Sequence, residues 1–305
     1  MSEIDGTAEK SLRVTSASRS ALFSTRKENA TMATENTSPI PDLNEETRNI
    51  WNQNATFWDD RMRDGNDFQS ILVNPASERL LNLRPGETVL EIACGNGVFA
   101  RHIARLGVHV IATDFSAQLL ERARTRTTEH ADLIEYCLVD ATREDQIVAL
   151  GLQRFDAAVC NQAIMDMAEI DPLMRGIRQV VKPGGRFVFS LCHPSFNHAG
   201  TALCAEETTV DGELVTTYSV KVAKYLSSHP QKGIAMVGQP VPHYYFDRPL
   251  HVLFNACFRA GLVLDGLEEP AFNYPHDGSQ IGRMLSWASY HEIPPVLVAR
   301  LHIPG

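Results

Sequence analysis

The 305-residue chain lacks closely spaced cysteines and long apolar runs. None of its six cysteines falls in a C-x-x-C pair, so we expect neither a zinc site nor a dithiol site, and we interpret the cysteines as free thiols in a reducing compartment. No apolar run approaches the roughly 20 residues that a membrane-spanning helix needs. Residues 1–24 include acids and no apolar stretch, which argues against a secretory leader. We therefore expect a cytoplasmic protein without a membrane partner.

Basic residues are also in short supply. The chain has 28 Lys and Arg against 37 Asp and Glu, a net charge of −9. Binding to nucleic acid through phosphate neutralisation requires a surplus of basic side chains, so we expect no nucleic-acid partner. A hydrophobic content of 44% is enough to bury a sizeable core.

The composition changes near residue 43. Residues 1–42 are rich in Ser, Thr, Asn and Glu and predict a disordered tail, in which Met32 could be an alternative start. Residues 43–305 are expected to form a single domain. Within it, apolar residues at three- and four-residue steps predict a helical cap over residues 43–84.

From Thr88 onwards, short apolar strands alternate with helices. The predicted strands are Val89–Ala93, Val108–Thr113, Leu133–Val139, Phe155–Asn161 and Arg186–Leu191. This alternation favours parallel pairing through right-handed crossovers and predicts a doubly wound α/β sheet over residues 85–192. An irregular insertion with a candidate hairpin strand follows over residues 193–246, and residues 247–305 would add a helix and two strands.

The first predicted strand runs directly into Cys94-Gly95-Asn96-Gly97 and a helix. In open α/β sheets the ligand lies beyond the carboxyl ends of the strands, and glycines there let the backbone approach it closely. Gly95-x-Gly97-x-x-Ala100 also fits the loose dinucleotide fingerprint, so an NAD(P)-dependent oxidoreductase and a purely structural turn remain alternatives. Glu91 favours S-adenosylmethionine (SAM), because a carboxylate attracts its sulfonium and ammonium groups and repels a pyrophosphate.

Two more acids fall at predicted strand ends. Asp114 ends the second strand, where a carboxylate can bind two ribose hydroxyls in an NAD enzyme as well as in a SAM-binding protein. Asp140 follows the third strand, where it could accept a hydrogen bond from an adenine amino group. Either acid alone could instead cap a helix. Three acids at successive strand ends favour a nucleoside ligand.

Five segments in this order resemble the successive motifs of class I SAM-dependent methyltransferases. They are Glu91–Gly97, Thr113–Ser116, Val139–Ala141, Phe155–Asn161 and Val181–Phe187. The flanking segments Trp51–Asp59, Gly65–Phe68 and His193–Asn197 resemble a small-molecule branch of that family. The resemblance implies a seven-stranded, mostly parallel sheet with its last strand antiparallel, SAM as cofactor and S-adenosylhomocysteine as product.

The resemblance also implies roles for individual residues. The residues that would hold the amino-acid part of SAM are Glu91, Ala93, Cys94, Gly95 and Gly97. Cys94 stands where many relatives have glycine. Those for the nucleoside are Asp114, Phe115 and Ser116 at the ribose, and Asp140 and Ala141 at adenine. Those bordering the methyl group are Asn161, Gln162 and Ala163.

Candidate acceptor residues lie on either side of these motifs. They are Phe68, His193, His243, Tyr244 and Tyr245. His193 could orient or deprotonate the acceptor, or it could hold the Pro194 turn locally. Trp58 could close over the cofactor as part of an aromatic lid, or its helix could simply pack on the domain. In-line methyl transfer needs no metal, and placing the nucleophile about 3 Å from the methyl group supplies much of the acceleration, so no metal site is expected.

The sequence therefore predicts an enzyme that transfers the methyl group of SAM to an O, N, S or C atom of a small molecule. An NAD(P)-dependent oxidoreductase and a SAM-binding protein that transfers no methyl group remain alternatives. A nucleic-acid methyltransferase is disfavoured by the net charge. It is also disfavoured because the segment Asn161–Ile164 lacks the Pro-Pro-aromatic run of the amino-methylating enzymes.

Overall fold

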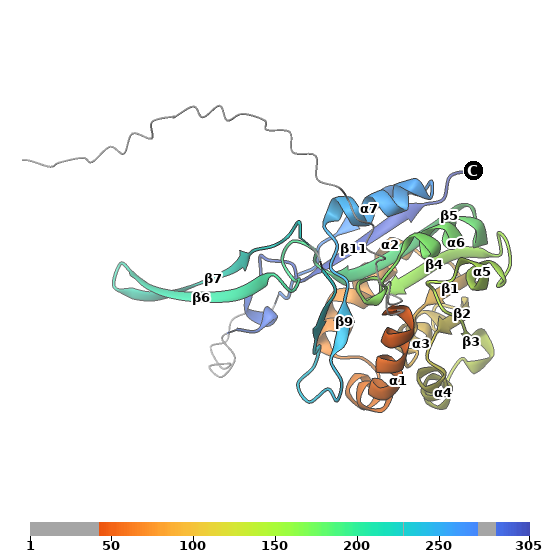
Figure 1. Ribbon diagram of the computed structural model, residues 1–305, viewed down its shortest axis with the longest axis horizontal. Helices are drawn as coiled ribbons and strands as arrows, with labels where there is room; N and C mark the ends of the chain where they lie inside the picture. Colours follow the sequence, from red (N-terminus) through yellow and green to blue (C-terminus); the bar gives the residue numbers. More distant parts are fainter. Residues whose placement is uncertain (1–42, 228, 274–284) are drawn as a thin grey trace, which may run out of the picture. The chain divides into compact units, whose positions relative to one another are not determined.

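The computed structural model describes residues 43–227, 229–273 and 285–305 (Figure 1). The tail predicted for residues 1–42 and its alternative start lie outside the described residues. The helices are α1 (Leu43–Met62), α2 (Asn74–Leu81), α3 (Val98–Ala104), α4 (Ala117–Arg126), α5 (Glu144–Val148), α6 (Asp171–Val180) and α7 (Leu250–Arg259), with short turns η1 (Phe68–Val73), η2 (Ala131–Leu133), η3 (Ile164–Asp166) and η4 (Trp287–Ser289). The strands are β1 (Thr88–Ile92), β2 (His109–Asp114), β3 (Ile134–Leu138), β4 (Phe155–Asn161), β5 (Val181–Cys192), β6 (Thr201–Val210), β7 (Glu213–Val222), β8 (Gln231–Gly233), β9 (His243–Tyr245), β10 (Val263–Glu268) and β11 (Val296–His302).

Seven of these strands form one sheet in the order β10-β11-β5-β4-β1-β2-β3. The pairs among β1 to β5 are parallel, as right-handed βαβ crossovers require. β11 lies between β5 and β10 and is antiparallel to both. The predicted seven-stranded doubly wound sheet with an antiparallel last strand is confirmed.

Alternate strand residues supply two separate apolar cores, one on each face of the sheet. On β1, Leu90 and Ile92 pack with α5, α6 and α7, whereas Val89 packs with α2, α3 and α4. The alternation follows from the two-residue period of a strand. Because both faces are covered, the free space for a ligand lies at the carboxyl ends of the strands, where β1, β2 and β4 run into loops.

The fifth strand begins earlier than the sequence pattern predicts. A turn is expected at Pro183–Gly185, but strand β5 already starts at Val181, and its pairing with β4 shifts register between Phe155 and Ala157. The extra residues form a bulge within β5. The Pro183-Gly184-Gly185 segment is therefore part of this bulge and does not end the strand.

The insertion after β5 contributes two small sheets. β6 and β7 pair antiparallel in a long hairpin, which Figure 1 shows as a separate two-stranded ribbon, and the strand predicted at Glu213–Val222 is β7. β8 and β9 form the second sheet, and β9 contacts α1. Asn54 of α1 fixes this contact, because its side-chain amide donates to the Val241 carbonyl (2.7 Å) and accepts from the Val241 N–H (3.1 Å).

Asp59 attaches the other side of α1 to the sheet domain. Its carboxylate accepts hydrogen bonds from Arg126 and from Arg122 (3.1 Å) of α4, and from the Asn96 amide (2.9 Å) beyond β1. Helix α1 is therefore held at the carboxyl edge of the sheet from two sides. In the described part of the chain, no helix is long and apolar enough to cross a membrane.

Candidate active site

The turn from β1 into α3 is built from residues with positive φ. Ala93, Gly95 and Gly97 have φ values of 53°, 56° and 75°. Asp114, at the end of the neighbouring β2, fixes this turn because its Oδ2 accepts a hydrogen bond from the Gly95 N–H (2.9 Å). A Cβ at Gly95 would meet no atom within 4 Å, whereas one at Gly97 would lie 2.5 Å from the Tyr136 hydroxyl. Gly95 therefore borders open space, and Gly97 allows close packing of α3 against β3.

This difference predicts unequal effects of two alanine substitutions. We expect Gly97→Ala to lower the free energy of unfolding by about 2–4 kcal/mol, because left-handed backbone strain adds to an overpacked contact. Gly95→Ala suffers only the strain, about 1–2 kcal/mol, and places its methyl group in the cavity. Urea unfolding of the two variants side by side measures the difference. Equal losses of stability would contradict the packing role assigned to Gly97.

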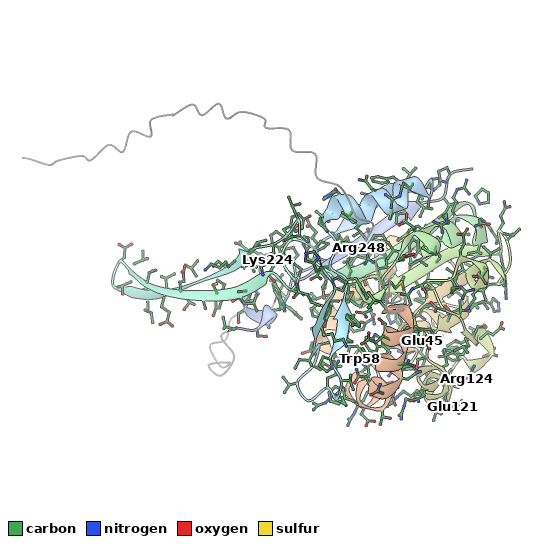
Figure 2. The ribbon with its side chains drawn as sticks, viewed as in Figure 1. Glu45, Trp58, Glu121, Arg124, Lys224 and Arg248 are labelled. Carbon is green, nitrogen blue, oxygen red and sulfur yellow. The ribbon has the colours of Figure 1, made fainter. Side chains whose placement is uncertain are left out.

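A cavity opens at the carboxyl ends of β1, β2, β3 and β4, beneath α1. Its lining includes twelve of the predicted cofactor residues: Trp58, Glu91, Ala93, Cys94, Gly95, Asp114, Phe115, Asp140, Ala141, Asn161, Gln162 and Ala163. Trp58 is contributed by α1 (Figure 2). The lining contains four acids (Glu91, Asp114, Asp140 and Asp166) but no Lys, Arg or His. The cavity therefore favours a cationic ligand.

Glu91 has an unsatisfied carboxyl oxygen in this lining. It is 3% exposed, and its Oε2 is buried with no hydrogen-bond partner. Burial raises the pKa of Glu91 to about 8, with a further upward contribution from Asp114, against the opposing charge of Arg101. A buried acceptor without a donor is costly, and an ammonium group from a ligand would satisfy it.

Asp114 and Asp140 have free acceptor capacity at the next two strand ends. Besides Gly95, Asp114 accepts from the Ser116 N–H (2.9 Å), and burial raises its pKa to about 6 in spite of these bonds. Asp140 uses Oδ1 for the N–H and hydroxyl of Thr142 (2.9 and 2.6 Å). Each carboxylate has further lone pairs for a ligand, such as ribose hydroxyls and an adenine amino group. Helix capping, the alternative role for Asp114, is performed by Ser116, whose hydroxyl accepts from the Leu119 N–H (3.2 Å).

Asn161 presents an unpartnered donor at the end of β4. Its Oδ1 accepts from the hydroxyls of Ser77 and Ser190, each at 2.9 Å, so the orientation of the amide is fixed. Its Nδ2 is buried and has no partner. The amide therefore directs a hydrogen-bond donor at whatever ligand occupies this part of the cavity. Gln162 follows with a φ of 52° and is held by the same Ser190 hydroxyl (3.1 Å).

The loop after β4 is fixed from behind by Arg248. This half-buried guanidinium donates to the carbonyls of Ile164 (3.1 Å), Ala168 (2.9 Å) and Met167, the residues on either side of Asp166. Backbone carbonyls only partly offset the cost of burial, which lowers the pKa of Arg248 to about 10. The bonds hold the Asp166 side chain in the cavity wall.

Seven predicted site residues lie outside the cavity lining: Phe68, Gly97, Ser116, His193, His243, Tyr244 and Tyr245. Phe68 packs near Phe272, with ring centroids 6.2 Å apart, and the Tyr244 hydroxyl donates to Glu46 (3.0 Å). His243 lies directly behind the lining, with its ring 4.9 Å from that of Trp51 and 4.4 Å from that of Tyr245.

His193 is bonded to protein groups through both ring nitrogens. It is 2% exposed, its Nδ1 accepts from the Ser195 N–H (3.1 Å), and its Nε2 lies 2.7 Å from Glu269. Because Nδ1 is an acceptor, Nε2 is the protonated nitrogen and donates to Glu269. Burial lowers the pKa of His193 although Glu269 opposes the shift. Both nitrogens are thus occupied, which agrees with the local role that the sequence left open.

Three important residues were not predicted from the sequence: Asp59, Asp166 and Arg248. Asp59 ends the flanking segment Trp51–Asp59, but its bonds, like those of Arg248, reach partners 37 or more positions away in the chain, so neither residue could be assigned a role from the sequence. Asp166 was detectable in principle, because it is an acid in an apolar stretch just after the fourth strand. Among the residues that the structure describes, no three His, Cys, Asp or Glu side chains are grouped as metal ligands would be.

Comparison with known proteins adds independent information. Residues 90–189 match a family model described as a methyltransferase domain. This segment of the chain is therefore similar to a methyltransferase domain. The chain is 26% identical over 137 residues to the ubiquinone biosynthesis O-methyltransferase of Xanthomonas axonopodis pv. citri, which covers 44% of this chain and 55% of that protein. The chain spans about half the length of the curated relatives that it matches.

Solved structures share the fold of this chain. A SAM-dependent methyltransferase from Mesorhizobium loti superposes with a TM-score of 0.57 at 24% identity, over 74% of this chain and 95% of the other. The [4+2]-cyclase SpnF superposes with a TM-score of 0.54 at 16% identity, over 87% and 98% of the two chains. The predicted resemblance to class I methyltransferases is confirmed in sequence and in fold.

Proposed function

We propose that this protein transfers the methyl group of SAM to a small molecule. The observation that carries the proposal is the buried Glu91 carboxyl, which has an unpartnered Oε2 and belongs to a cavity lining with four acids and no basic side chain. An ammonium and a sulfonium group fit such a lining, whereas the pyrophosphate of NAD(P) would be repelled by it. The alternative of an NAD(P)-dependent oxidoreductase is disfavoured for this reason.

When bound, SAM would supply an electrophilic methyl group on a sulfonium. The residues of this chain would bind and orient it. Glu91 would hold the ammonium group, Asp114 the ribose hydroxyls and Asp140 the adenine amino group. Asn161, with its fixed amide, would border the methyl group. Trp51 and Trp58 of α1 would exclude water from above, since both line the cavity.

The segment boundaries that we propose separate the residues that would bind the cofactor from those that would bind the acceptor. Residues 43–84 form the helical cap, residues 85–192 the cofactor-binding core, residues 193–246 the substrate-side insertion, and residues 247–305 the last helix and strands. We place the reaction in the cytoplasm, because all six cysteines are free thiols, as in a reducing compartment. The proposed acceptor is a small molecule and not a nucleic acid.

Product analysis tests the proposal. The protein is incubated with SAM labelled in its methyl group and a metabolite extract, and new labelled molecules are sought by mass spectrometry. Calorimetry with S-adenosylhomocysteine and, separately, NADH decides between the cofactors. Tight binding of S-adenosylhomocysteine without any labelled product would favour a SAM-binding protein that transfers no methyl group. Binding of NADH alone would favour an oxidoreductase.

His193 provides a further prediction. Because its ring nitrogens bond to Ser195 and Glu269, we expect His193→Ala to lower the free energy of unfolding by about 1–3 kcal/mol through two lost hydrogen bonds. We expect methyl transfer by the folded variant to keep its turnover number. Steady-state kinetics on the first acceptor identified measures this. A loss of turnover in a variant with an unchanged unfolding midpoint would restore the catalytic role predicted from the sequence.

A further inference from the structure

One acid in the cavity is left without a role after the cofactor is accommodated. Glu91, Asp114 and Asp140 lie at the ends of the three neighbouring strands β1, β2 and β3. Asp166 follows β4, on the opposite side of β1, and also lines the cavity. SAM brings one net positive charge to a lining with four acids. Asp166 therefore lies where a second molecule would approach the methyl group.

Asp166 has no strong partner within the described protein. Its Oδ1 is buried without a hydrogen bond, and the nearest donor is Nε2 of His243 at 3.7 Å, which is too far for one. His243 cannot act as a cation here. Gln239 donates to its Nδ1 (2.9 Å), and burial lowers its pKa to about 4, so the ring is neutral near pH 7.

The other titratable groups that face Asp166 are neutral as well. Cys160 of β4, Cys192 of β5 and Tyr245 of β9 surround it, and burial raises the pKa of all three side chains. Burial also raises the pKa of Asp166 well above its ordinary value. A carboxyl group in this setting is satisfied best by a cation that arrives with the ligand.

Aromatic side chains border the same part of the cavity. Trp51 packs against His243 and, edge to face, against Trp58 at 4.8 Å, and both tryptophans line the cavity. Indole faces attract cations within about 6 Å. An anionic acceptor, such as a carboxylate, would be repelled by an ionised Asp166, whereas an ammonium group would offset the cost of ionising it.

We propose that the methyl acceptor is an amine whose ammonium form binds Asp166 at the Trp51 side of the cavity, and that Asp166 is its base; this rests on the proposed function. The Asp166 carboxylate takes a proton from the ammonium group and becomes a carboxylic acid. The freed nitrogen lone pair forms the new N–C bond as the C–S bond breaks. The electron pair of that bond stays on sulfur, which becomes the neutral thioether of S-adenosylhomocysteine, and the product is the methylated ammonium ion.

A pair of isosteric probes tests the binding part. The complex with S-adenosylhomocysteine is titrated with benzylamine and with benzyl alcohol at pH 7. We expect the dissociation constant of benzylamine to be at least about tenfold lower than that of benzyl alcohol. This preference should disappear in Asp166→Asn and persist in Glu169→Gln, an exposed acid of the same loop. No measurable preference in the wild type, or an equal preference in both variants, overturns the inference.

The pH dependence tests the role as base. We expect kcat/KM of Asp166→Asn for an amine acceptor to be at least about tenfold lower than that of the wild type at pH 7. This loss should shrink as the pH approaches the pKa of the amine, since the free base then forms in solution. A loss that is independent of pH, or methylation of phenols or carboxylates but not of amines, overturns the inference and leaves methyl transfer intact. Failure to bind S-adenosylhomocysteine at all instead refutes the proposed function.

Discussion

Replacing Glu91 with glutamine is expected to raise the dissociation constant for SAM about 30- to 150-fold at pH 8, equivalent to about 2–3 kcal/mol, the range for losing one partner of a buried charge pair. The amide would turn an N–H group toward the ligand ammonium in place of the unpartnered Oε2. Isothermal titration calorimetry measures the change. A glutamine that preserves the wild-type affinity would contradict the placement of the ammonium group at Glu91.

The same interaction should make the affinity of the wild type depend on pH. With a pKa of about 8, Glu91 is protonated in the ligand-free protein at pH 7, so binding an ammonium group requires release of a proton. The affinity should increase by close to tenfold per pH unit between about pH 6.5 and 7.5. Below this range Asp114, with a pKa of about 6, also titrates, and above it the α-amino group of the ligand begins to lose its own proton.

Stability should show the opposite trend. Because folding raises the pKa of Glu91 from 4.5 to about 8, its contribution to the ligand-free protein is complete below pH 4.5 and lost as the pH rises through 8. Glu91→Gln keeps a neutral side chain and should lose this dependence without being destabilised at pH 7. Glu121→Gln, whose side chain is 76% exposed, serves as the matched control and should behave as the wild type in both measurements. A pH-independent affinity in the wild type would show that Glu91 is already ionised before binding.

The fold could be predicted because its determinants are local. Short apolar runs such as Val89–Ala93 alternate with amphipathic helices. This alternation specifies a parallel sheet regardless of the conformation of the connecting loops. That Glu91, Asp114 and Asp140 line one cavity was predictable for a related reason. Glu91, Asp114 and Asp140 lie at or next to the carboxyl ends of β1, β2 and β3. These strands are neighbours in the sheet, so the topology alone brings their ends together.

The acceptor side was harder to predict because its contacts are distant in sequence. His193 stands at a strand end like the cofactor acids, yet its neighbours Ser195 and Glu269 occupy both ring nitrogens, and no pattern shows this beforehand. His243 was placed in the substrate site but lies one layer behind it, against Trp51. The insertion that contributes it folds onto α1 through Asn54 and Val241, residues 187 positions apart.

Asp59 connects the three elements that close the cavity. Its carboxylate is 6% exposed and joins α1 to Arg122 and Arg126 of α4, and to Asn96, which lines the cavity. Burial alone would raise its pKa, but the hydrogen bonds from Arg126, Asn96 and Arg122 outweigh this and lower the pKa below its ordinary value. The neighbouring Trp58 lines the cavity, so a displacement of α1 would reach the ligand directly.

We therefore expect Asp59→Asn to lower the free energy of unfolding by about 2–3 kcal/mol, less than for a fully buried pair because both arginines are partly exposed. The dissociation constant for SAM should rise about tenfold as α1 loosens. Since the folded-state pKa is lowered, the stabilisation by Asp59 is present above pH 3.8 and lost as the pH falls below it, so wild type and variant should converge in acid. Urea unfolding at pH 7 and pH 3 measures this.

Two controls separate the hydrogen bonds of the Asp59 carboxylate to α4 and Asn96, which we call the carboxylate clamp, from a general effect of charge. Asp60→Asn removes the adjacent, exposed carboxylate and should change stability by less than about 0.5 kcal/mol. In the double variant Asp59→Asn with Arg126→Gln, the loss should be smaller than the sum of the single losses, because both substitutions break the same contact. If Asp59→Asn unfolds like Asp60→Asn and binds SAM like the wild type, the clamp does not hold α1 over the cavity. The aromatic lid would then depend on the other contacts of α1, which include Asn54 with Val241, Glu46 with Tyr244 and Asn52 with Ser116.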